Sequence, residues 1–193
     1  MNCSGHTLVI GGSGMLADVC LQLSAQGEVV HVLARTEQKL QNLVKQSQNH
    51  PGKIVPIQQD YRDLLGLKEQ IEEAIKQFGS FHQVLMWIHS TAPKAPETAL
   101  SALQAFTKED VPLKCVRIHG SAWKNPARQQ KEDPILEMFP SVRHCSVILG
   151  FVVDSDGSRW LTDQEISQGV ISALDSEEKE YVVGVVEPWS MRP

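Results

Sequence analysis

Residues 7–17, with the sequence TLVIGGSGMLA, decide the fold of this chain. A short apolar run stops at a glycine-rich turn, and the residues after the turn have apolar side chains at helical spacing. Gly12, Gly14 and Ala17 fit the pattern G-x-G-x-x-G/A, in which the first glycine permits a tight turn and the second lets the backbone approach a pyrophosphate. The stretch therefore predicts a dinucleotide-binding turn, and the alternative is a strand-to-helix turn that binds nothing.

The phosphates are expected at the N-terminus of a helix that starts near Met15, where unpaired backbone N–H groups and the helix dipole favour negative charge. A second apolar run at 29–33 completes a strand-helix-strand unit of the usual size. The predicted contacts of the turn with the cofactor come from Gly11, Gly12, Ser13, Gly14, Met15 and Leu16.

Arg35 and Thr36 follow the second predicted strand, at the place where an NAD-binding site usually has an acidic residue for the ribose. The guanidinium of Arg35 can pair with a 2′-phosphate, and the hydroxyl of Thr36 can add a hydrogen bond. These residues favour NADP over NAD as the cofactor. The alternative is that Arg35 is a solvated residue at a helix start and that Thr36 only caps the helix.

Seven strand-like runs alternate with helical patterns along the chain, which is typical of a parallel sheet. We therefore expect an α/β fold: a single Rossmann-type domain over residues 1–193, with a doubly wound parallel sheet of about seven strands and helices on both faces. The expected strands are 7–10, 29–33, 54–57, 83–88, 114–118, 146–152 and 181–186. The expected helices are 15–26, 37–48, 62–78, 97–107, 133–138 and 162–174.

Composition excludes several classes of function. The chain has 193 residues and a formal net charge of -5 with mixed signs, so neither nucleic acid nor an anionic membrane is an expected partner. It has no apolar stretch near the ~20 residues of a membrane span and no signal peptide pattern, and we expect a cytoplasmic protein. The helix at 162–174 is a candidate either to cover the site or to form the surface of a homo-oligomer.

The four cysteines, Cys3, Cys20, Cys115 and Cys145, are scattered and form no C-x-x-C pair, so we expect buried reduced thiols and no metal site. The stretch from Asp154 to Gly157 has only the first half of a calcium loop, and an Asp/Gly turn is the better interpretation.

Polar residues follow the third and fourth predicted strands, where loops border the ligand crevice of an open parallel sheet. Asp60, next to Tyr61, is a candidate acceptor for the adenine amine, and its alternative role is to cap the helix that begins near residue 62. His89 and Ser90 are expected to line the nicotinamide ribose. Gly150, after the sixth strand, permits a close backbone approach to the nicotinamide.

The combination of GGSGMLA (11–17), LARTEQKL (33–40), QQDYRD (58–63) and the polar turn after the fourth strand resembles the short-chain dehydrogenase/reductase superfamily, particularly its short atypical members. The resemblance covers nearly the whole chain. It implies a seven-stranded Rossmann domain, an NAD(P) cofactor across the strand ends, and hydride transfer to a carbonyl.

The same resemblance implies a Tyr-x-x-x-Lys pair and a serine just beyond the fifth strand. The tyrosines of this chain are Tyr61 and Tyr181, and neither has a lysine at the fourth following position. Ser121 falls where the serine is expected, and Lys124 and His119 are candidates for proton transfer. The alternatives are a strand-end histidine satisfied by hydrogen bonds and a solvated lysine.

Two functions follow from this pattern. The first is an NADP-dependent oxidoreductase of the atypical short-chain type that acts on an unidentified small-molecule carbonyl or enone. The second is a non-catalytic NAD(P)-binding redox sensor or scaffold, which the missing tyrosine favours. The polar residues after the fifth strand favour the enzyme.

Overall fold

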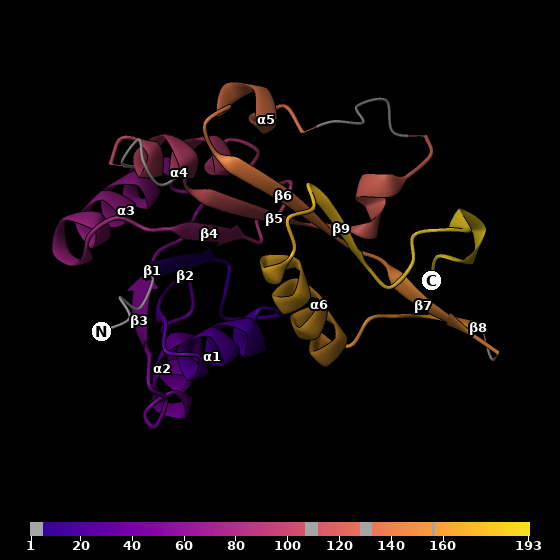
Figure 1. Ribbon diagram of the computed structural model, residues 1–193, viewed down its shortest axis with the longest axis horizontal. Coiled ribbons are helices and arrows are strands. Elements are labelled where there is room, and N and C mark those ends of the chain that lie inside the picture. Colours follow the sequence, from indigo (N-terminus) through magenta and orange to yellow (C-terminus); the bar gives the residue numbers. More distant parts are fainter. Residues whose placement is uncertain (1–5, 107–111, 128–132, 156) are drawn as a thin grey trace.

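The computed structural model describes residues 6–106, 112–127, 133–155 and 157–193. Its central sheet is formed by β1 (His6–Ile10), β2 (Val29–Ala34), β3 (Lys53–Gln58), β4 (Gln83–Met86), β5 (Lys114–Gly120), β6 (Arg143–Leu149) and β9 (Glu180–Val183). The strand order is β3-β2-β1-β4-β5-β6-β9, and all neighbouring strands run parallel (Figure 1). Two further strands, β7 (Phe151–Asp154) and β8 (Gly157–Trp160), form an antiparallel hairpin beside the sheet.

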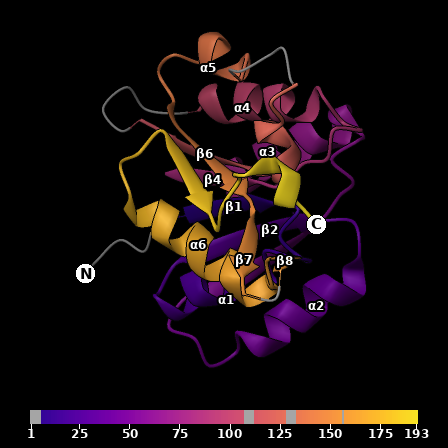
Figure 2. The same ribbon diagram turned by 90° about the vertical axis from the view of Figure 1, so that its right-hand side faces the viewer.

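Helices cover both faces of this sheet (Figures 1 and 2). One face is covered by α1 (Ala17–Ala25), α2 (Glu37–Gln46) and α6 (Asp163–Asp175), and the other by α3 (Leu64–Phe78), α4 (Ala95–Gln104) and α5 (Ile135–Met138). Two short 3-10 helices, η1 (Ser121–Lys124) and η2 (Trp189–Met191), follow β5 and β9. The predicted doubly wound α/β sheet of seven parallel strands is confirmed.

Strand β1 lies at the point where the strand order reverses. It pairs on one side with β2, the next strand in the chain, and on the other side with β4. Leu8, Val9 and Ile10 have no exposed surface, as expected for a strand that is covered on both faces. Ligands of open parallel sheets bind outside the carboxyl ends of the strands at such a reversal. The glycine turn starts there, directly after Ile10.

The sixth strand ends earlier than the predicted range 146–152, because the chain leaves the sheet at Gly150. Phe151 and Val185 exchange two backbone hydrogen bonds of 2.9 Å, which form an isolated antiparallel bridge. A Cβ atom at Gly150 would lie 2.1 Å from the carbonyl oxygen of Val185, so the crossing of these two segments requires a glycine. The hairpin β7–β8 that follows was not predicted.

Other predicted boundaries shift by a few residues as well. β4 ends at Met86 rather than 88, β9 ends at Val183 rather than 186, and α1 begins at Ala17 rather than at Met15. The glycine turn occupies the residues before α1, and it closes where the Ala17 N–H donates a hydrogen bond of 2.8 Å to the Gly14 carbonyl. The helix therefore starts one half-turn later than its apolar pattern indicates.

Helix α3 is capped by Asp63, so the predicted alternative role of Asp60 as its cap is wrong. The Asp63 carboxylate accepts a hydrogen bond of 3.1 Å from the Gly66 N–H, and the helix begins at Leu64 rather than at Arg62. Asp60 accepts a hydrogen bond of 3.0 Å from the Arg62 N–H, which closes the turn before the helix. The Asp60 carboxylate therefore stays at the edge of the crevice.

Cys20, Cys115 and Cys145 are buried and free, as predicted for reduced thiols, and Cys3 lies outside the described residues. Burial raises the pKa of the Cys20 and Cys115 thiols to about 12, so these side chains act as small apolar groups in the core.

The predicted Asp/Gly turn joins β7 to β8, with Asp154 opposite Gly157 and with Asp156 outside the described residues. Within the described ranges, no three His, Cys, Asp or Glu side chains are grouped so that they could hold a metal ion. In the same residues, no helix has the length and apolar character that a membrane span requires.

His31 is a fully buried histidine in the middle of β2. Its ring packs against the rings of Phe78 and Phe81, with centroids 4.8 and 4.9 Å away, and its Nε2 lies 3.3 Å from Nδ1 of His6. Burial, aided by the charges of His6 and Lys53, lowers the pKa of His31 from 6.5 to about 4. The folded state therefore holds this ring neutral.

We predict that His31 makes the protein less stable in mild acid. Between pH 6.5 and 4 the unfolded chain binds a proton at His31 that the folded chain excludes, so the free energy of unfolding falls as the pH falls through this window. The loss between pH 7 and 5 should be about 2 kcal/mol in urea titrations. His31→Leu should remove this part of the pH dependence, and an unchanged difference between the two pH values would contradict the assignment.

Candidate functional site

The glycine turn uses its glycines for three different purposes. Gly11 has a positive φ of 84°, and a Cβ atom there would lie 2.3 Å from the Trp87 carbonyl oxygen, so Gly11 rather than Gly12 makes the tight turn. A Cβ atom at Gly12 would lie 3.0 Å from Sγ of Cys20 in α1, so Gly12 is the residue that lets the helix pack on the sheet. The predicted assignment of the tight turn to Gly12 is corrected accordingly.

Gly14 differs from the other two, because a Cβ atom there would meet no atom of the described structure within 4 Å. Its side-chain position opens into space in front of the N-terminus of α1, where the first backbone N–H groups of the helix lie. Ser13 and Met15 are half-buried, whereas the Leu16 side chain has no exposed surface and offers only its backbone. The turn therefore provides a cradle that fits a pyrophosphate on its backbone.

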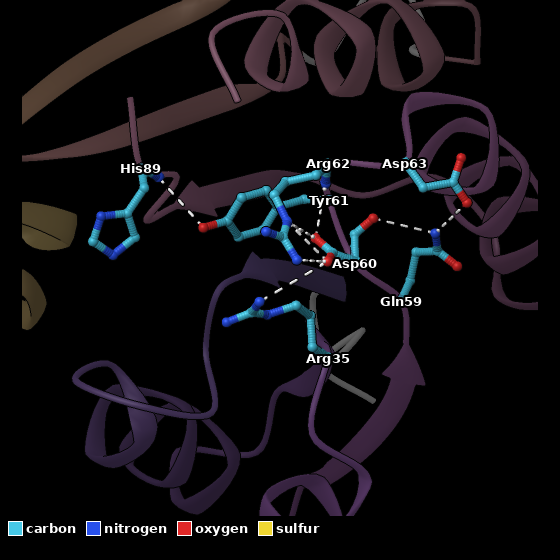
Figure 3. Close-up of polar contacts among 7 residues, drawn as sticks. All are labelled: Arg35, Gln59, Asp60, Tyr61, Arg62, Asp63 and His89. Carbon is cyan, nitrogen blue, oxygen red and sulfur yellow. Dashed lines mark hydrogen bonds and ion pairs between the residues drawn. The ribbon is translucent and has the colours of Figure 1, made fainter. Parts of the chain in front are cut away.

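Arg35, Asp60 and Arg62 form a charged cluster at the carboxyl ends of β2 and β3 (Figure 3). Arg62 holds the Asp60 carboxylate with its Nε at 3.1 and 3.0 Å and its Nη2 at 2.5 Å. Nη1 of Arg35 lies 4.0 Å from the same carboxylate, and 60% of the Arg35 side chain is exposed. Two guanidinium groups thus converge on one carboxylate, and sequence analysis had not singled out Arg62.

The hydrogen bonds from Arg62, with smaller contributions from the charges of Arg62 and Arg35, lower the pKa of Asp60. An ionised carboxylate accepts hydrogen bonds, as the predicted contact with an adenine amine requires. Thr36 occupies the N-cap position of α2, yet its exposed hydroxyl makes no capping hydrogen bond to the helix. The Thr36 hydroxyl is therefore available to bind a ligand or water.

Tyr61 reaches from the end of β3 to the segment after β4 (Figure 3). Its hydroxyl oxygen accepts a long hydrogen bond of 3.5 Å from the His89 N–H. The His89 ring contacts the indole of Trp87 edge-on, with centroids 5.6 Å apart. His89 and Ser90, which are predicted to line the nicotinamide ribose, line a cavity of about 450 Å³, and Tyr61 does not line it.

This larger cavity lies beside the carboxyl ends of β4 and β5. Its walls include Trp87, Arg117, His119 and Trp123. The His119 and Trp123 rings stack, with centroids 3.7 Å apart and planes inclined by 22°. His119, the predicted candidate for proton transfer, thus lines this cavity together with Trp123.

Arg117 is held by a buried ion pair behind this cavity. Its Nη1 donates a hydrogen bond to the carboxylate of Asp133, which also accepts one of 3.2 Å from the Ile135 N–H. Nε2 of His119 lies 3.8 Å from the same carboxylate. Arg117 and Asp133 were not among the predicted site residues. Arg117 and His119 lie two positions apart on one face of β5, a signal that could have found Arg117, whereas Asp133 lies before α5 and has no such signal.

A smaller cavity of about 280 Å³ adjoins the larger one and shares Trp87 and Gly120 with it. Met15 of the glycine turn, Ser121 and Gly150 line it. Gly150 contributes its backbone to the wall of the smaller cavity. A glycine is required at this position because the C-terminal segment at Val185 leaves no room for a Cβ atom. The predicted nicotinamide contact of Gly150 remains a prediction.

Ser121, the serine predicted just beyond the fifth strand, is buried with 3% of its surface exposed. Its Oγ accepts a hydrogen bond of 2.8 Å from Nε of Arg192, a residue that sequence analysis had not considered. Lys124, in contrast, lines neither cavity, and its Nζ donates a hydrogen bond of 2.6 Å to Glu180. The structure thus brings Ser121 and His119 to the two cavities and gives Lys124 a carboxylate partner at the edge of the sheet.

Sequence comparison matches the N-terminal part of the chain to a known family. The family model for short chain dehydrogenases matches residues 5–96 of the chain. The match includes the glycine turn, Arg35, Asp60 and His89, and it ends before the segment that contains Ser121. No curated protein matches the chain by sequence.

Solved structures share the whole fold. The citronellol catabolism dehydrogenase of Pseudomonas aeruginosa superposes with a TM-score of 0.72 at 14% identity, over 94% of each chain. An alcohol dehydrogenase from the archaeon Thermococcus sibiricus, complexed with 5-hydroxy-NADP, has a TM-score of 0.72 at 13% identity, over 93% of this chain and 95% of that one. A metagenomic short-chain oxidoreductase in complex with NADP has a TM-score of 0.71 at 16% identity, over 94% and 96%.

We predict that substitutions at the two neighbouring glycines separate folding from binding. Gly14→Val places a side chain in the open space before α1, and it should weaken NADPH binding on the order of 100-fold or more with little change in melting temperature. Gly12→Val must displace Val9, Val32 and Cys20, and it should lower the free energy of unfolding by roughly 1–3 kcal/mol.

Calorimetric titration and thermal melting of both variants check this pair of outcomes. A folded Gly14→Val protein that binds NADPH as tightly as the wild type would show that the pyrophosphate does not lie at this turn.

Proposed function

We propose that the chain is a member of the short-chain dehydrogenase/reductase superfamily and an NADP(H)-dependent oxidoreductase that reduces a carbonyl or an enone. One observation carries the proposal: the open glycine turn, Arg35 and the two adjoining cavities follow one another along the carboxyl ends of the strands. In open parallel sheets, a dinucleotide binds along this edge, outside the carboxyl ends of the strands. We further propose that residues 1–193 act as one dinucleotide-binding domain.

The residues of the adenosine end fit NADP better than NAD. Arg35 is exposed beside the crevice, and the residue before it, Ala34, cannot bond the ribose of NAD with its side chain. Arg62 neutralises Asp60, the nearest carboxylate, so a 2′-phosphate next to Arg35 would meet little repulsion. Two of the similar proteins form complexes with NADP or a derivative of it, which supports the same choice.

Reduction of a carbonyl needs a hydride on carbon and a proton on oxygen, and bound NADPH supplies the hydride. Ser121 accepts its hydrogen bond from Arg192 with a lone pair, so its own O–H can donate to the substrate oxygen in the smaller cavity. His119 lies in the adjoining cavity and can pass a proton from water to that oxygen. Lys124 was the third candidate, and its pairing with Glu180 makes it the least suitable of the three.

We predict that Arg35→Ala weakens NADPH binding by on the order of 1.5 to 3 kcal/mol, because it removes a charge-assisted contact with the 2′-phosphate. The affinity for NADH, which lacks this phosphate, should not change. Lys39→Ala is a matched control, since Lys39 is exposed on the same helix start and lies four residues further along. Equal losses for the two cofactors, or no loss for NADPH, would argue against an NADP site at Arg35.

We also predict that Ser121→Ala lowers the turnover of NADPH with aldehydes, quinones or enones by ~10²-fold or more while the affinity for NADPH holds. Tyr181→Phe should leave turnover unchanged, because Tyr181 lies in β9 and lines neither cavity. Loss of turnover in the Tyr181→Phe protein would contradict the assignment. Tight NADPH binding without turnover of any substrate would instead favour a cofactor sensor.

A further inference from the structure

We propose that Arg192, together with Ser121, binds the carboxylate of the substrate, and that the substrate is an α-oxo acid with an apolar side chain. This inference rests on the proposed function, since it concerns the substrate of the same site. The geometry that points to it is a cation placed next to the substrate-binding serine at the mouth of an apolar cavity.

Arg192 is held next to Ser121 by contacts with η1, with the hairpin β7–β8 and with η2. The chain returns after β9 through the antiparallel bridge between Phe151 and Val185, and this bridge directs the C-terminal residues over the ends of β5 and β6. Figure 1 shows η2 and the C-terminus near η1 and the hairpin β7–β8. The Arg192 guanidinium lies over the indole of Trp160 from this hairpin, 4.8 Å from its centroid, and 5.2 Å from that of Trp189 in η2.

The two indoles and the serine hold the guanidinium without neutralising it. Arg35, Arg62, Arg117 and Arg159 each lie within 4.0 Å of a carboxylate. Within the described residues, Arg192 has no carboxylate at that distance. Its Nε donates to the neutral hydroxyl of Ser121, so an anionic ligand would be its natural charge partner.

The cavity beside Arg192 determines what kind of anion fits. Leu149, Leu161 and Ile166 form an apolar wall, and Ser121 and Arg192 are the polar side chains of the lining. A volume of about 280 Å³ admits a small hydrocarbon body but not a second nucleotide. The ligand is therefore an amphipathic small molecule with its anionic group at Arg192.

The distance between the two polar groups selects an α-oxo acid. Nε of Arg192 and Oγ of Ser121 are 2.8 Å apart, so the two groups that they bind must also be close together. In an α-oxo acid the carboxylate and the reducible carbonyl are adjacent, and the planar guanidinium can bind the carboxylate while the serine donates to the carbonyl oxygen. Arg192 then acts as a specificity-determining residue that positions the carbonyl.

The test compares α-ketoisocaproate with its methyl ester, which has the same carbonyl and hydrocarbon body but no negative charge. Binding is measured by calorimetry and by indole fluorescence in the presence of oxidised NADP, so that no turnover is needed. The wild-type protein should bind the acid more tightly than the ester. Arg192→Gln should weaken acid binding roughly 10- to 100-fold and leave ester binding unchanged, and Arg192→Lys should recover part of the loss.

Arg143→Gln is the charge-matched control, because Arg143 is exposed at the start of β6, at the opposite end of the strands. Equal binding of acid and ester by the wild-type protein would overturn the inference, even if Arg192→Gln failed to fold. A loss of NADP affinity in Arg192→Gln, with acid binding unchanged, would also overturn it by assigning Arg192 to the cofactor. Failure of the wild-type protein to bind NADPH would instead overturn the proposed function, and titration of the acid alone would still test Arg192.

Discussion

The close approach of the glycine turn to its neighbours is the constraint on which the rest of this structure depends. The turn passes so close to the Trp87 carbonyl and to Cys20 that neither Gly11 nor Gly12 has room for a Cβ atom. This contact joins the ends of β1, β2 and β4 to the start of α1, at the place where the strand order reverses. The crevice begins at this contact, and the candidate site residues other than Lys124 lie along the crevice or behind it.

Electrostatics divide the crevice into two ends of different character. At the adenosine end, two arginines share the Asp60 carboxylate, so the cluster keeps a net positive charge that suits a phosphate. At the other end, Arg117 is neutralised by buried Asp133, whereas Arg192 has only a hydroxyl and two indoles around it. The protein thus offers one cationic group at each end of the space proposed for the dinucleotide.

Much of this arrangement follows from local sequence signals. The glycine turn, the residue type at position 35 and the alternation of strands with helices each depend on neighbours within a few residues, and they predicted the parallel sheet and the position of the crevice. The tight turn was assigned to Gly12 rather than Gly11, because the motif does not state which glycine has the positive φ. The cap of α3 was misplaced for a similar reason, since Asp60 and Asp63 both precede the helix.

The features that the sequence did not predict depend on contacts between distant residues. Arg192 and Ser121 are 71 residues apart, and their contact requires the hairpin β7–β8 and the returning C-terminal segment, neither of which has a strong periodic pattern. The ion pair of Arg117 with Asp133 likewise joins a strand to the segment before α5. In such places the tertiary contact, and not the local propensity, determines the conformation.

A crystal structure of the protein with bound NADP tests the central claim most directly. The account predicts the pyrophosphate over the backbone of residues 13–15, the 2′-phosphate within hydrogen-bond distance of Arg35, and the nicotinamide where the two cavities adjoin, next to Ser121. A dinucleotide bound elsewhere on the protein, or one whose 2′-phosphate turns away from Arg35 while its nicotinamide lies outside both cavities, would contradict it.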